Sequence, residues 1–432
     1  MRLGKSKLDI TPPQGVDMCG YARKGRKAKG IHDPLYVRAI VFEEGERKCA
    51  ILSCDLVGIP PELVREVREY ARINLGIERE HVLISATHTH SGPTVSVIRG
   101  MGEPLPSYMK DLREKVKEAL KEADKDYREV KMKVGRGKVK VGINRRERTK
   151  EGVKLGLNPE GPLDEELGLI SFWKEDEEPE VFLVNYACHP VSLGINFEIS
   201  ADYPGKLCSL MEKKYPNSLC LFLQGCCGDI NPYSKERGFS LTERMAKELF
   251  EEVERVRKHS EPLRDMDIKG LILPVKLPLD GLPSREELKK EKRELEKKIE
   301  KAKEEEMGIL EAHLDWIERA LKEEKGKERF IPAEIQILSL GSVALVGIPG
   351  EVFSEIGMRI KRGSPFPYTF VIGYANGCYG YIPTREAFKE GGYEVEEAYK
   401  YYGIYPFRED VGEVVVDCAL KGLKKIKEGR NE

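Results

Sequence analysis

The sequence predicts an α/β fold, with sheets flanked by helices and a helical hairpin inserted between strands. Short apolar or β-branched runs recur along the chain, and amphipathic helical patterns lie between several of them. Strands that alternate with helices are typical of α/β sheets. A segment rich in Glu and Lys interrupts this pattern at residues 284–326. At 432 residues the chain can bury a large core, and we expect one domain covering residues 1–432.

The apolar runs indicate where strands begin and end. In the first half they lie at residues 37–42, 50–54, 82–86, 169–172, 181–187 and 219–223. Residues 61–75 and 108–123 place apolar side chains three and four positions apart, which predicts amphipathic helices. The second half repeats this pattern with an apolar run at 335–348, a helix at 352–362, a strand at 368–374 and a final helix at 411–427.

The segment 284–326 is predicted to form two helices. Its apolar residues recur at helical spacing, Ser284 and Glu287 match a capping box, and Gly308 indicates a turn. Two roles stay open for this hairpin: a solvated spacer, or an element that covers a site or contacts another subunit. If the protein forms a homo-oligomer, we expect the contact here.

Composition excludes several classes of partner. Lys plus Arg number 73 and Asp plus Glu 74, so the net charge is −1 and no basic surface is expected to bind nucleic acid. No run is long enough to span a membrane, and residues 1–12 lack the pattern of a signal peptide. We therefore expect a cytoplasmic protein without a membrane partner. The abundance of Glu and Lys, with only three Gln, is typical of thermophile proteins.

Ten cysteines are scattered through the chain, mostly in apolar segments, and no Cys-x-x-Cys pair occurs. Buried, reduced thiols are the simpler interpretation. Because Cys226 and Cys227 stand beside expected site residues, a nucleophilic thiol there stays open.

One short segment carries the strongest chemical signal. Thr87-His88-Thr89-His90 directly follows the expected strand at 82–86, and Gly92-Pro93 ends regular structure after it. The two imidazoles therefore fall at the carboxyl end of a strand, where α/β sheets bind ligands. Neutral imidazole is the commonest metal ligand in proteins, so the segment suits a metal site.

Three further polar clusters share this position after an apolar run: they contain His189, Glu351 and, at residues 376–384, the tyrosines Tyr379 and Tyr381. Glu351 also stands where a helix is expected to begin, which favours its ionised form. Imidazoles, a carboxylate and a phenolate form a nitrogen and oxygen donor set suited to Zn²⁺, although Mn²⁺ or Fe²⁺ would also fit. Tyr379 is an alternative to Tyr381, because a shift of the loop would exchange them.

These motifs, in this order, resemble those of the neutral, non-lysosomal ceramidase family of zinc-dependent amidases. The resemblance is carried by Gly30-Ile31-His32, residues 87–93, Ile143-Asn144-Arg145, residues 185–190, Gly228-Asp229, residues 349–351 and residues 376–384. It covers most of the chain and implies a ceramidase-like catalytic domain with mixed sheets flanked by helices.

The resemblance also implies roles for individual residues. It assigns the zinc ligands to His88, His189, Glu351 and Tyr381. It places Tyr393 in the same site. His90 and Arg145 match residues that contact the substrate or the developing oxyanion without binding the metal.

One departure from the family affects the mechanism. Where ceramidases have a catalytic serine before a proline, this chain has Asn231 before Pro232. An amide can donate or accept a hydrogen bond, but it cannot lose a proton at neutral pH. From its length we also expect neither the immunoglobulin-like carboxyl-terminal domain of the family nor an export signal. These differences lead us to expect a substrate other than a lipid amide.

The sequence thus predicts a zinc-dependent hydrolase in which a metal-activated water attacks a carbonyl of a small polar substrate: an amide, a lactone or a sugar-derived cyclic ketone. Arg145, His90 and Tyr393 are expected to stabilise the oxyanion or protonate the leaving group. Asn231 and Asp229 are expected to position substrate or water. Retained ceramide hydrolysis, and a non-catalytic protein stabilised by its metal, are the alternatives.

Other polar residues each keep two interpretations. His32 either orients a loop or supports a metal ligand, and Asp55 either caps a turn or contacts an imidazole. Asp202 either caps a helix or accepts a proton. His259 and His313 lie in charged helical stretches and are expected to face solvent.

Overall fold

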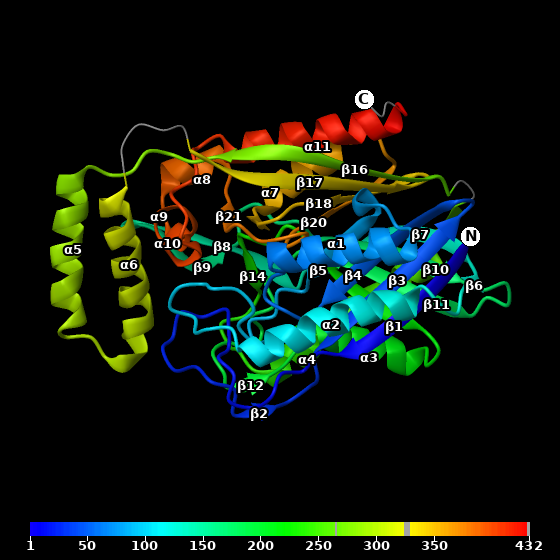
Figure 1. Ribbon diagram of the computed structural model, residues 1–432, viewed down its shortest axis with the longest axis horizontal. Coiled ribbons are helices and arrows are strands. Elements are labelled where there is room, and N and C mark those ends of the chain that lie inside the picture. Colours follow the sequence, from blue (N-terminus) through cyan, green and yellow to red (C-terminus); the bar gives the residue numbers. More distant parts are fainter. Residues whose placement is uncertain (264–265, 324–328, 430–432) are drawn as a thin grey trace.

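Three sheets carry most of the strands, and helices cover their outer faces (Figure 1). The computed structural model describes residues 1–263, 266–323 and 329–429. The sheets mix parallel and antiparallel pairs, which confirms the predicted α/β class. Within the described residues, no helix combines the length and apolar composition needed to cross a bilayer.

The first sheet contains β1 (Arg2–Asp9), β3 (Tyr36–Glu44), β4 (Arg47–Cys54), β5 (Val82–Ala86) and β6 (Arg128–Glu129). Its strand order is β5-β4-β3-β1-β6, and β4 and β5 are parallel. Helices α1 (Pro61–Leu75) and α2 (Pro106–Ala123) pack on one face, and the short 3-10 helix η1 (Arg79–His81) leads into β5.

The second sheet contains β7 (Lys131–Lys138), β10 (Glu166–Trp173), β11 (Pro179–Tyr186), β13 (Leu219–Gln224) and β15 (Glu261–Leu263). Its order is β13-β11-β10-β7-β15, with β11 and β13 parallel. Helices α3 (Asp202–Lys214) and α4 (Phe239–Lys258) cover it.

The third sheet contains β16 (Ile268–Pro278), β17 (Phe330–Leu340), β18 (Val343–Gly347) and β20 (Tyr368–Ile372). Helices α7 (Ser354–Gly363) and α11 (Val411–Lys427) pack against it. The apolar run at 335–348, read from the sequence as one unit, is two antiparallel strands joined at Gly341 and Ser342. Gly341 has a φ of 55°, which permits the tight turn.

Short elements complete the fold around the strand ends. They are β2 (Gly30–Ile31), β8 (Gly142–Thr149), β9 (Gly152–Asn158), β12 (Glu198–Ile199), β14 (Ile230–Pro232), β19 (Glu351–Val352), β21 (Tyr381–Ile382), α8 (Arg385–Glu390), α9 (Tyr393–Glu396) and α10 (Ala398–Tyr402). The parallel pair β19 and β21 places Glu351 directly opposite Tyr381.

The segment expected to form a helical hairpin contains α5 (Arg285–Ile299) and α6 (Glu304–Lys322), which stand at one end of the molecule (Figure 1). Ser284 and Glu287 form the expected capping box. The turn expected at Gly308 is wrong: the chain turns between the two helices, and Gly308 lies inside α6. The expected end of the segment, Gly326, lies outside the described residues.

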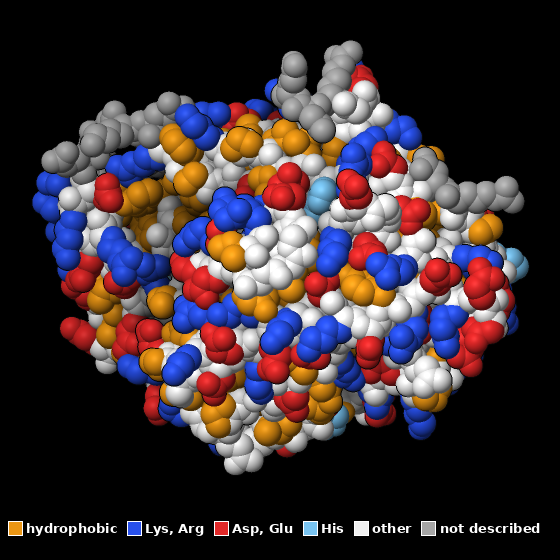
Figure 2. Space-filling model, turned by 45° about the vertical axis from the view of Figure 1, so that its right-hand side comes forward, with side chains coloured by type: hydrophobic (Ala, Val, Ile, Leu, Met, Phe, Trp, Pro, Cys, Tyr) orange, Lys and Arg blue, Asp and Glu red, His pale blue; other side chains and the backbone are white. Residues whose placement is uncertain are grey.

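The sheets share one central core, because their strands are buried on both faces. Ile40 and Phe42 of β3 belong to a cluster of buried apolar side chains that come from all three sheets. Ala39 and Val41 point the other way, towards α1 and α2. This alternation follows from the two-residue period of a strand. Charged side chains of both signs are interspersed over the face in Figure 2, as the balanced composition predicts.

The carboxyl ends of the parallel strands are tied together by backbone hydrogen bonds. The N–H of Ala86, at the end of β5, donates to Tyr374 after β20 at 3.2 Å. The N–H of Gly373 donates to Gln224, at the end of β13, at 3.0 Å. Loops that are far apart in the sequence therefore leave the three sheets at one place.

Candidate metal centre

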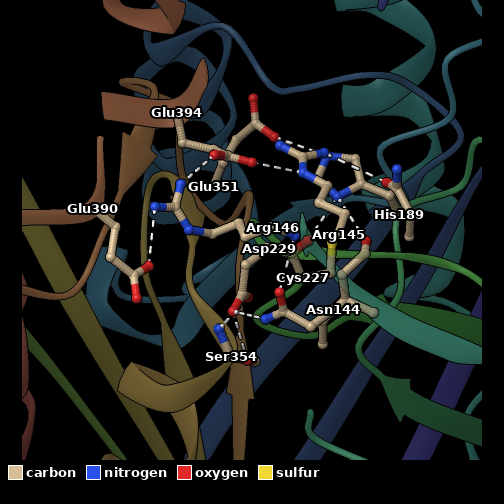
Figure 3. A network of polar contacts seen from close by, with 12 residues as sticks. Asn144, Arg145, Arg146, His189, Cys227, Asp229, Glu351, Ser354, Glu390 and Glu394 are labelled. Carbon is tan, nitrogen blue, oxygen red and sulfur yellow. Dashed lines mark hydrogen bonds and ion pairs between the residues drawn. The ribbon is translucent and has the colours of Figure 1, made fainter. Parts of the chain in front are cut away.

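Three imidazoles and one carboxylate meet where the sheets converge. His88 and His90 lie in the loop after β5, His189 follows β11, and Glu351 begins β19. His88 Nε2 is 3.1 Å from His90 Nε2 and 3.3 Å from Glu351 Oε2. His189 Nε2 is 3.0 Å from the same oxygen, and Figure 3 shows these two side chains together. The three histidines each offer a nitrogen within 4.8 Å of the others.

Hydrogen bonds to the backbone set which ring nitrogen faces the centre. Nδ1 of His88 lies 2.5 Å from the carbonyl oxygen of Val57, and Nδ1 of His189 lies 2.6 Å from that of Cys227. A carbonyl only accepts, so each Nδ1 donates, and in a neutral ring Nε2 then carries a lone pair. Burial, followed by the charge of Arg145, lowers the pKa of His189 to about 4, so this ring is neutral at pH 7.

This arrangement fits a metal ion. With neutral rings, the lone pairs of two Nε2 atoms face a carboxylate oxygen in a buried space, and no hydrogen lies between them. Facing acceptors repel one another unless a cation separates them. Imidazole nitrogen and carboxylate oxygen are ligands that Zn²⁺ prefers, and backbone carbonyls behind the rings are the usual outer partners.

Two strained residues form one wall of the centre. His88 and Tyr374 have φ values of 67° and 53°, in the left-handed region that side chains other than glycine rarely adopt. Their rings stack with centroids 3.8 Å apart. Each such conformation costs on the order of 1 to 3 kcal/mol and persists only where the surroundings enforce it. The strand ends thus hold the imidazole of His88 in a position that a relaxed chain would not choose.

Glu351 is ionised in this environment. Burial alone would raise the pKa of its carboxyl group, whereas positive charge on the side of His88 and His189 outweighs burial and holds the pKa well below the usual value; with neutral rings, a bound metal ion would supply that charge. Tyr374 donates its hydroxyl hydrogen to Oε2 at 3.2 Å, and Tyr402 donates to Oε1. Both oxygens of the carboxylate are therefore engaged.

Tyr381 is buried next to two residues of the site. Its ring centroid is 6.5 Å from that of His189, and the guanidinium carbon of Arg145 lies 5.2 Å from the ring centre. Burial raises the pKa of the Tyr381 phenol well above its usual value. The alternative, Tyr379, is half-buried, and the charged side chains that act on its pKa are those of Glu334 and Arg65 rather than of the centre.

Arg145 is oriented by a buried carboxylate. Its Nε donates to Glu394 Oε1 at 2.8 Å, and Arg146 donates to the other oxygen at 2.6 Å (Figure 3). Nη1 of Arg145 lies 3.5 Å from Asn231 Oδ1. The guanidinium carbon lies 5.9 Å from the ring centre of Tyr393. Nη2 is buried without a hydrogen-bond partner. Among the described residues this nitrogen meets no acceptor at hydrogen-bond geometry, although Arg145 also interacts with the Tyr381 phenol, so it can bind an oxygen of a ligand beside that phenol.

Asp229 holds the start of a helix and a neighbouring loop in place. Its Oδ1 accepts the backbone N–H of Ser354 at 2.7 Å, and its Oδ2 accepts the Ser354 hydroxyl and the Asn144 amide, each at 3.0 Å (Figure 3). Ser354 begins α7, so Asp229 satisfies donors at the start of this helix. These contacts support the loop of Asn231 and do not place the carboxylate at the imidazoles.

A buried positive charge lies behind His90. Arg26 donates to the backbone carbonyls of Asn196, Cys19 and His90 at 2.8 to 2.9 Å. Burial lowers its pKa to about 10, so it is still charged at neutral pH. Within the described residues, no carboxylate lies within the 4.0 Å of an ion pair with Arg26. His90 itself has a buried Nδ1 without a partner.

Sequence comparison identifies the relatives of this chain. The family described as neutral/alkaline non-lysosomal ceramidase, N-terminal, matches residues 1–236, which is more than half of the chain. The chain belongs to this ceramidase family. The neutral ceramidase of Drosophila melanogaster is 35% identical over 96 residues, and that of Pseudomonas aeruginosa is 36% identical over 97 residues. Each alignment covers 21% of this chain and 14% of the relative.

Solved structures show the same ceramidase fold. The crystal structure of neutral ceramidase from Pseudomonas aeruginosa superposes with a TM-score of 0.75 at 19% identity, covering 98% of this chain and 74% of that one. A structure described as ceramidase complexed with C2 gives a TM-score of 0.78 at 18% identity, covering 99% and 75%. These likenesses confirm the predicted fold class.

The other polar candidates, each of which kept two interpretations, have ordinary structural partners. His32 is exposed, bonds to Asp33 at 2.7 Å and stacks on a phenylalanine. Asp55 forms a buried ion pair with Arg38 at 2.7 Å. Asp202 accepts hydrogen bonds from Ser192 and nearby backbone N–H groups. None of these partners is an imidazole of the centre.

Two further expectations about reactive groups are resolved. His313 does not face solvent as expected: burial lowers its pKa to about 4, and its ring lies 5.3 Å from that of Tyr401. His259 is exposed, as expected. All ten cysteines are free thiols, and burial raises the pKa of Cys227 well above its usual value, which disfavours a nucleophilic thiolate.

Four site residues are absent from the sequence-based candidates. They are Arg26, Tyr374, Glu394 and Tyr402. Tyr374 ends an expected strand and Glu394 follows Tyr393, so their positions in the sequence indicated only weakly that they belong to the site. Arg26 and Tyr402 are placed by loops and short helices, for which apolar periodicity gives no signal.

Proposed function

We propose that this chain is a zinc-dependent hydrolase in which water attacks a carbonyl group of a small polar substrate. The observation that carries the proposal is the convergence of buried imidazole and carboxylate lone pairs next to a guanidinium nitrogen that meets no acceptor at hydrogen-bond geometry among the described residues. A closed structural zinc site is usually rich in cysteine and has no such neighbours. Membership of the ceramidase family supports hydrolysis as the reaction class.

His88, His189 and Glu351 would hold the zinc ion, with His90 or Tyr381 as the further ligand. When bound, zinc polarises a carbonyl and lowers the pKa of a water molecule from about 15.7 to about 7. Asn231 occupies the position expected for a serine, and no protein nucleophile is needed when water attacks. The water oxygen adds to the carbonyl carbon, the bond to the leaving group breaks, and the proton of water passes to that group.

The side chains around the centre supply the remaining steps. Nη2 of Arg145 donates to the carbonyl oxygen as its negative charge develops. Burial, together with the neighbouring imidazoles, holds the pKa of His90 well below its usual value, so this ring is a neutral base at pH 7. Its Nε2, which lies 3.1 Å from Nε2 of His88 and faces the centre, can accept the proton of water and return it to the leaving group. The Tyr393 phenol, protonated because burial raises its pKa, is a second donor.

The charge of the site favours a polar substrate over a neutral lipid. Arg26 places an uncompensated charge beside His90, and Arg145 shares its carboxylate with Arg146. A buried positive charge that has no carboxylate partner among the described residues stabilises substrates or transition states that carry negative charge. Amides, lactones and sugar-derived cyclic ketones all pass through an anionic addition at the carbonyl. Hydrolysis of ceramide is the alternative, favoured by the names of the curated relatives.

Elemental analysis of the purified protein is the first test. Wild type should contain about one zinc per chain, His88→Ala should contain none, and the exposed His259→Ala should match wild type. His90→Ala separates its two roles: retained zinc with lost turnover makes it a proton carrier, and lost zinc makes it a ligand. A panel of amides, lactones, cyclic ketones and micellar ceramide then ranks the substrates. Absence of metal from wild type, even after zinc is added, would remove the proposal.

A further inference from the structure

The two oxygens of Glu351 have different partners. Oε2 faces the Nε2 atoms of His88 and His189 and also accepts the Tyr374 hydroxyl at 3.2 Å, whereas the partner of Oε1 is the Tyr402 hydroxyl. A carboxylate can bind a metal through one oxygen or through both. Oε2 is the oxygen at which both imidazole nitrogens meet, and the hydrogen bond from Tyr402 holds Oε1 in place, so Oε2 is the oxygen presented to the centre. This arrangement leaves a coordination position for water or substrate, as catalytic zinc sites require.

Tyr402 is held in place by the inserted hairpin. It ends α10, and the residues on either side of it pack on Trp316 of α6. The Trp316 ring lies 5.2 Å from Tyr399 and 6.3 Å from Tyr405, and its indole N–H donates to the carbonyl of Ile404 at 2.7 Å. Lys400, within α10, forms an ion pair with Glu291 of α5 at 2.8 Å. Both helices of the hairpin therefore fix the short segment that carries the phenol.

The same hairpin is docked on the loops before and after His90. Lys24 pairs with Glu311 at 2.7 Å, and Arg99 pairs with Asp315. At Gly100, a side-chain carbon would lie only 2.3 Å from the carbonyl oxygen of Gly308 in α6. Two glycines therefore allow the helix and the loop to touch backbone to backbone. This close contact excludes a free-standing spacer.

We propose that Tyr402 is a positioning residue that keeps Glu351 a one-oxygen metal ligand, and that Trp316 of the inserted hairpin keeps Tyr402 in position. The inference rests on the proposed metal site. It gives the hairpin a role in metal binding, in place of the open alternatives of spacer and cover. Outer partners of metal ligands typically contribute 10- to 100-fold to metal affinity.

The test compares Tyr402→Phe with Tyr401→Phe in the full-length protein. Tyr401 is the preceding residue in α10, and its ring lies on His313 and Tyr393 rather than on Glu351. Zinc affinity, measured by competition with a chromophoric chelator, should fall on the order of tenfold or more in Tyr402→Phe and stay within about twofold in Tyr401→Phe. The unfolding midpoints of the two metal-free variants should agree.

Cobalt substitution gives a spectroscopic signature that a merely structural role would not change. Visible absorption of Co²⁺ weakens when its coordination number rises. Tyr402→Phe should show weaker bands than wild type, since the released Oε1 of Glu351 joins the metal, while Tyr401→Phe should keep the wild-type spectrum.

The hairpin is tested by Trp316→Phe, which removes the N–H donor to Ile404 and keeps an aromatic ring. The matched control is Trp173→Phe in β10, the other tryptophan of the chain, whose N–H donates to Ser171 at 2.8 Å. Trp316→Phe should lower zinc affinity in the same direction as Tyr402→Phe, and Trp173→Phe should not.

The outcomes separate the two proposals. If wild type binds zinc tightly but Tyr402→Phe binds it equally well, the role of Tyr402 is wrong and the metal site stands. If only the tyrosine variant loses affinity, the role of the hairpin is wrong. If wild type binds neither zinc nor cobalt, the proposed function fails and the inference fails with it.

Discussion

The imidazole side and the phenol side of the centre are supported in different ways. His88 and His189 follow buried strands, and their Nδ1 atoms donate to backbone carbonyls of neighbouring loops. Tyr393 and Tyr402 lie on the short helices α9 and α10, and side chains of the inserted hairpin hold α10 and the residues that follow it. The imidazole side is therefore part of the core of the sheets, whereas the phenol side is formed by short helices outside the sheets.

This difference separates two properties of the site. Removing the imidazole of His88 or His189 should abolish metal binding, because the strand end would then offer no ligand atom to the metal. Changes on the phenol side should tune affinity, geometry or turnover while the imidazoles remain in place. The following predictions test that division, from the largest expected effect to the smallest.

His189→Ala should abolish zinc binding and turnover together. The side chain is fully buried and contributes a lone pair at the middle of the cluster, so its loss should exceed the 10- to 100-fold effect, by order of magnitude, of an outer partner. Zinc content and hydrolysis are measured on the same preparation, with His259→Ala as the control. A variant that retains full zinc would show that the imidazole side is not the metal-binding side.

Glu394→Gln should lower turnover on the order of tenfold while zinc content stays at the wild-type level. This carboxylate orients Arg145 but does not touch the imidazoles, and donors to an oxyanion contribute roughly 100- to 1,000-fold when removed outright. The control is Glu390→Gln, since Glu390 pairs with Arg146 and Arg148 and is partly exposed. Loss of zinc in Glu394→Gln would break the division between the two sides.

Gly308→Ala distinguishes a docked hairpin from a loose one by the sign of a stability change. In a free helix, replacing Gly by Ala stabilises by about 1 kcal/mol. In this structure the new carbon would lie 3.0 Å from the Gly100 oxygen and the Lys24 nitrogen, which opposes that gain. We expect a lower urea midpoint than wild type. A midpoint raised by the full gain expected for a free helix would mean that α6 does not contact the Gly100 loop in solution.

Acid should weaken the hairpin contact slightly through His313. Burial lowers the pKa of this ring to about 4, below the value near 6.5 in an unfolded chain. Between these values the unfolded state binds more protons, so stability is fully present above pH 6.5 and is lost as pH falls towards 4. The fall in urea midpoint from pH 7.5 to pH 5 should be smaller in His313→Gln than in wild type. Equal falls would mean that the ring is not buried between α6 and α10 in solution.

Apolar periodicity was sufficient for the elements that are buried on one or two clear faces. The helix expected at 61–75, the strand at 82–86 and the helix at 411–427 match α1, β5 and α11. β8 and β9 were not expected, because β8 reads Gly-Ile-Asn-Arg-Arg-Glu-Arg-Thr and much of β9 is exposed. A strand whose outer half faces solvent has no continuous apolar run.

The site was predicted where its residues follow strands. His88, His189 and Glu351 meet as the strand-end argument requires, since the carboxyl ends of parallel strands converge. Glycine was read as a turn at Gly308, whereas it allows a close approach inside a helix. Tyr402 reaches Glu351 across 51 positions of sequence, through α10 and the hairpin. Such tertiary placement leaves no local pattern.

The distance in sequence between the imidazoles and the carboxylate affects how the protein is made. His88 and His189 belong to the first 236 residues, which match the ceramidase family, whereas Glu351 and Tyr402 lie well beyond them. A nascent chain that has emerged only as far as the hairpin therefore holds the imidazoles without the carboxylate that faces them. Completion of the centre is a late event of synthesis, and capture of a metal ion by all its ligands must wait for the final third of the chain.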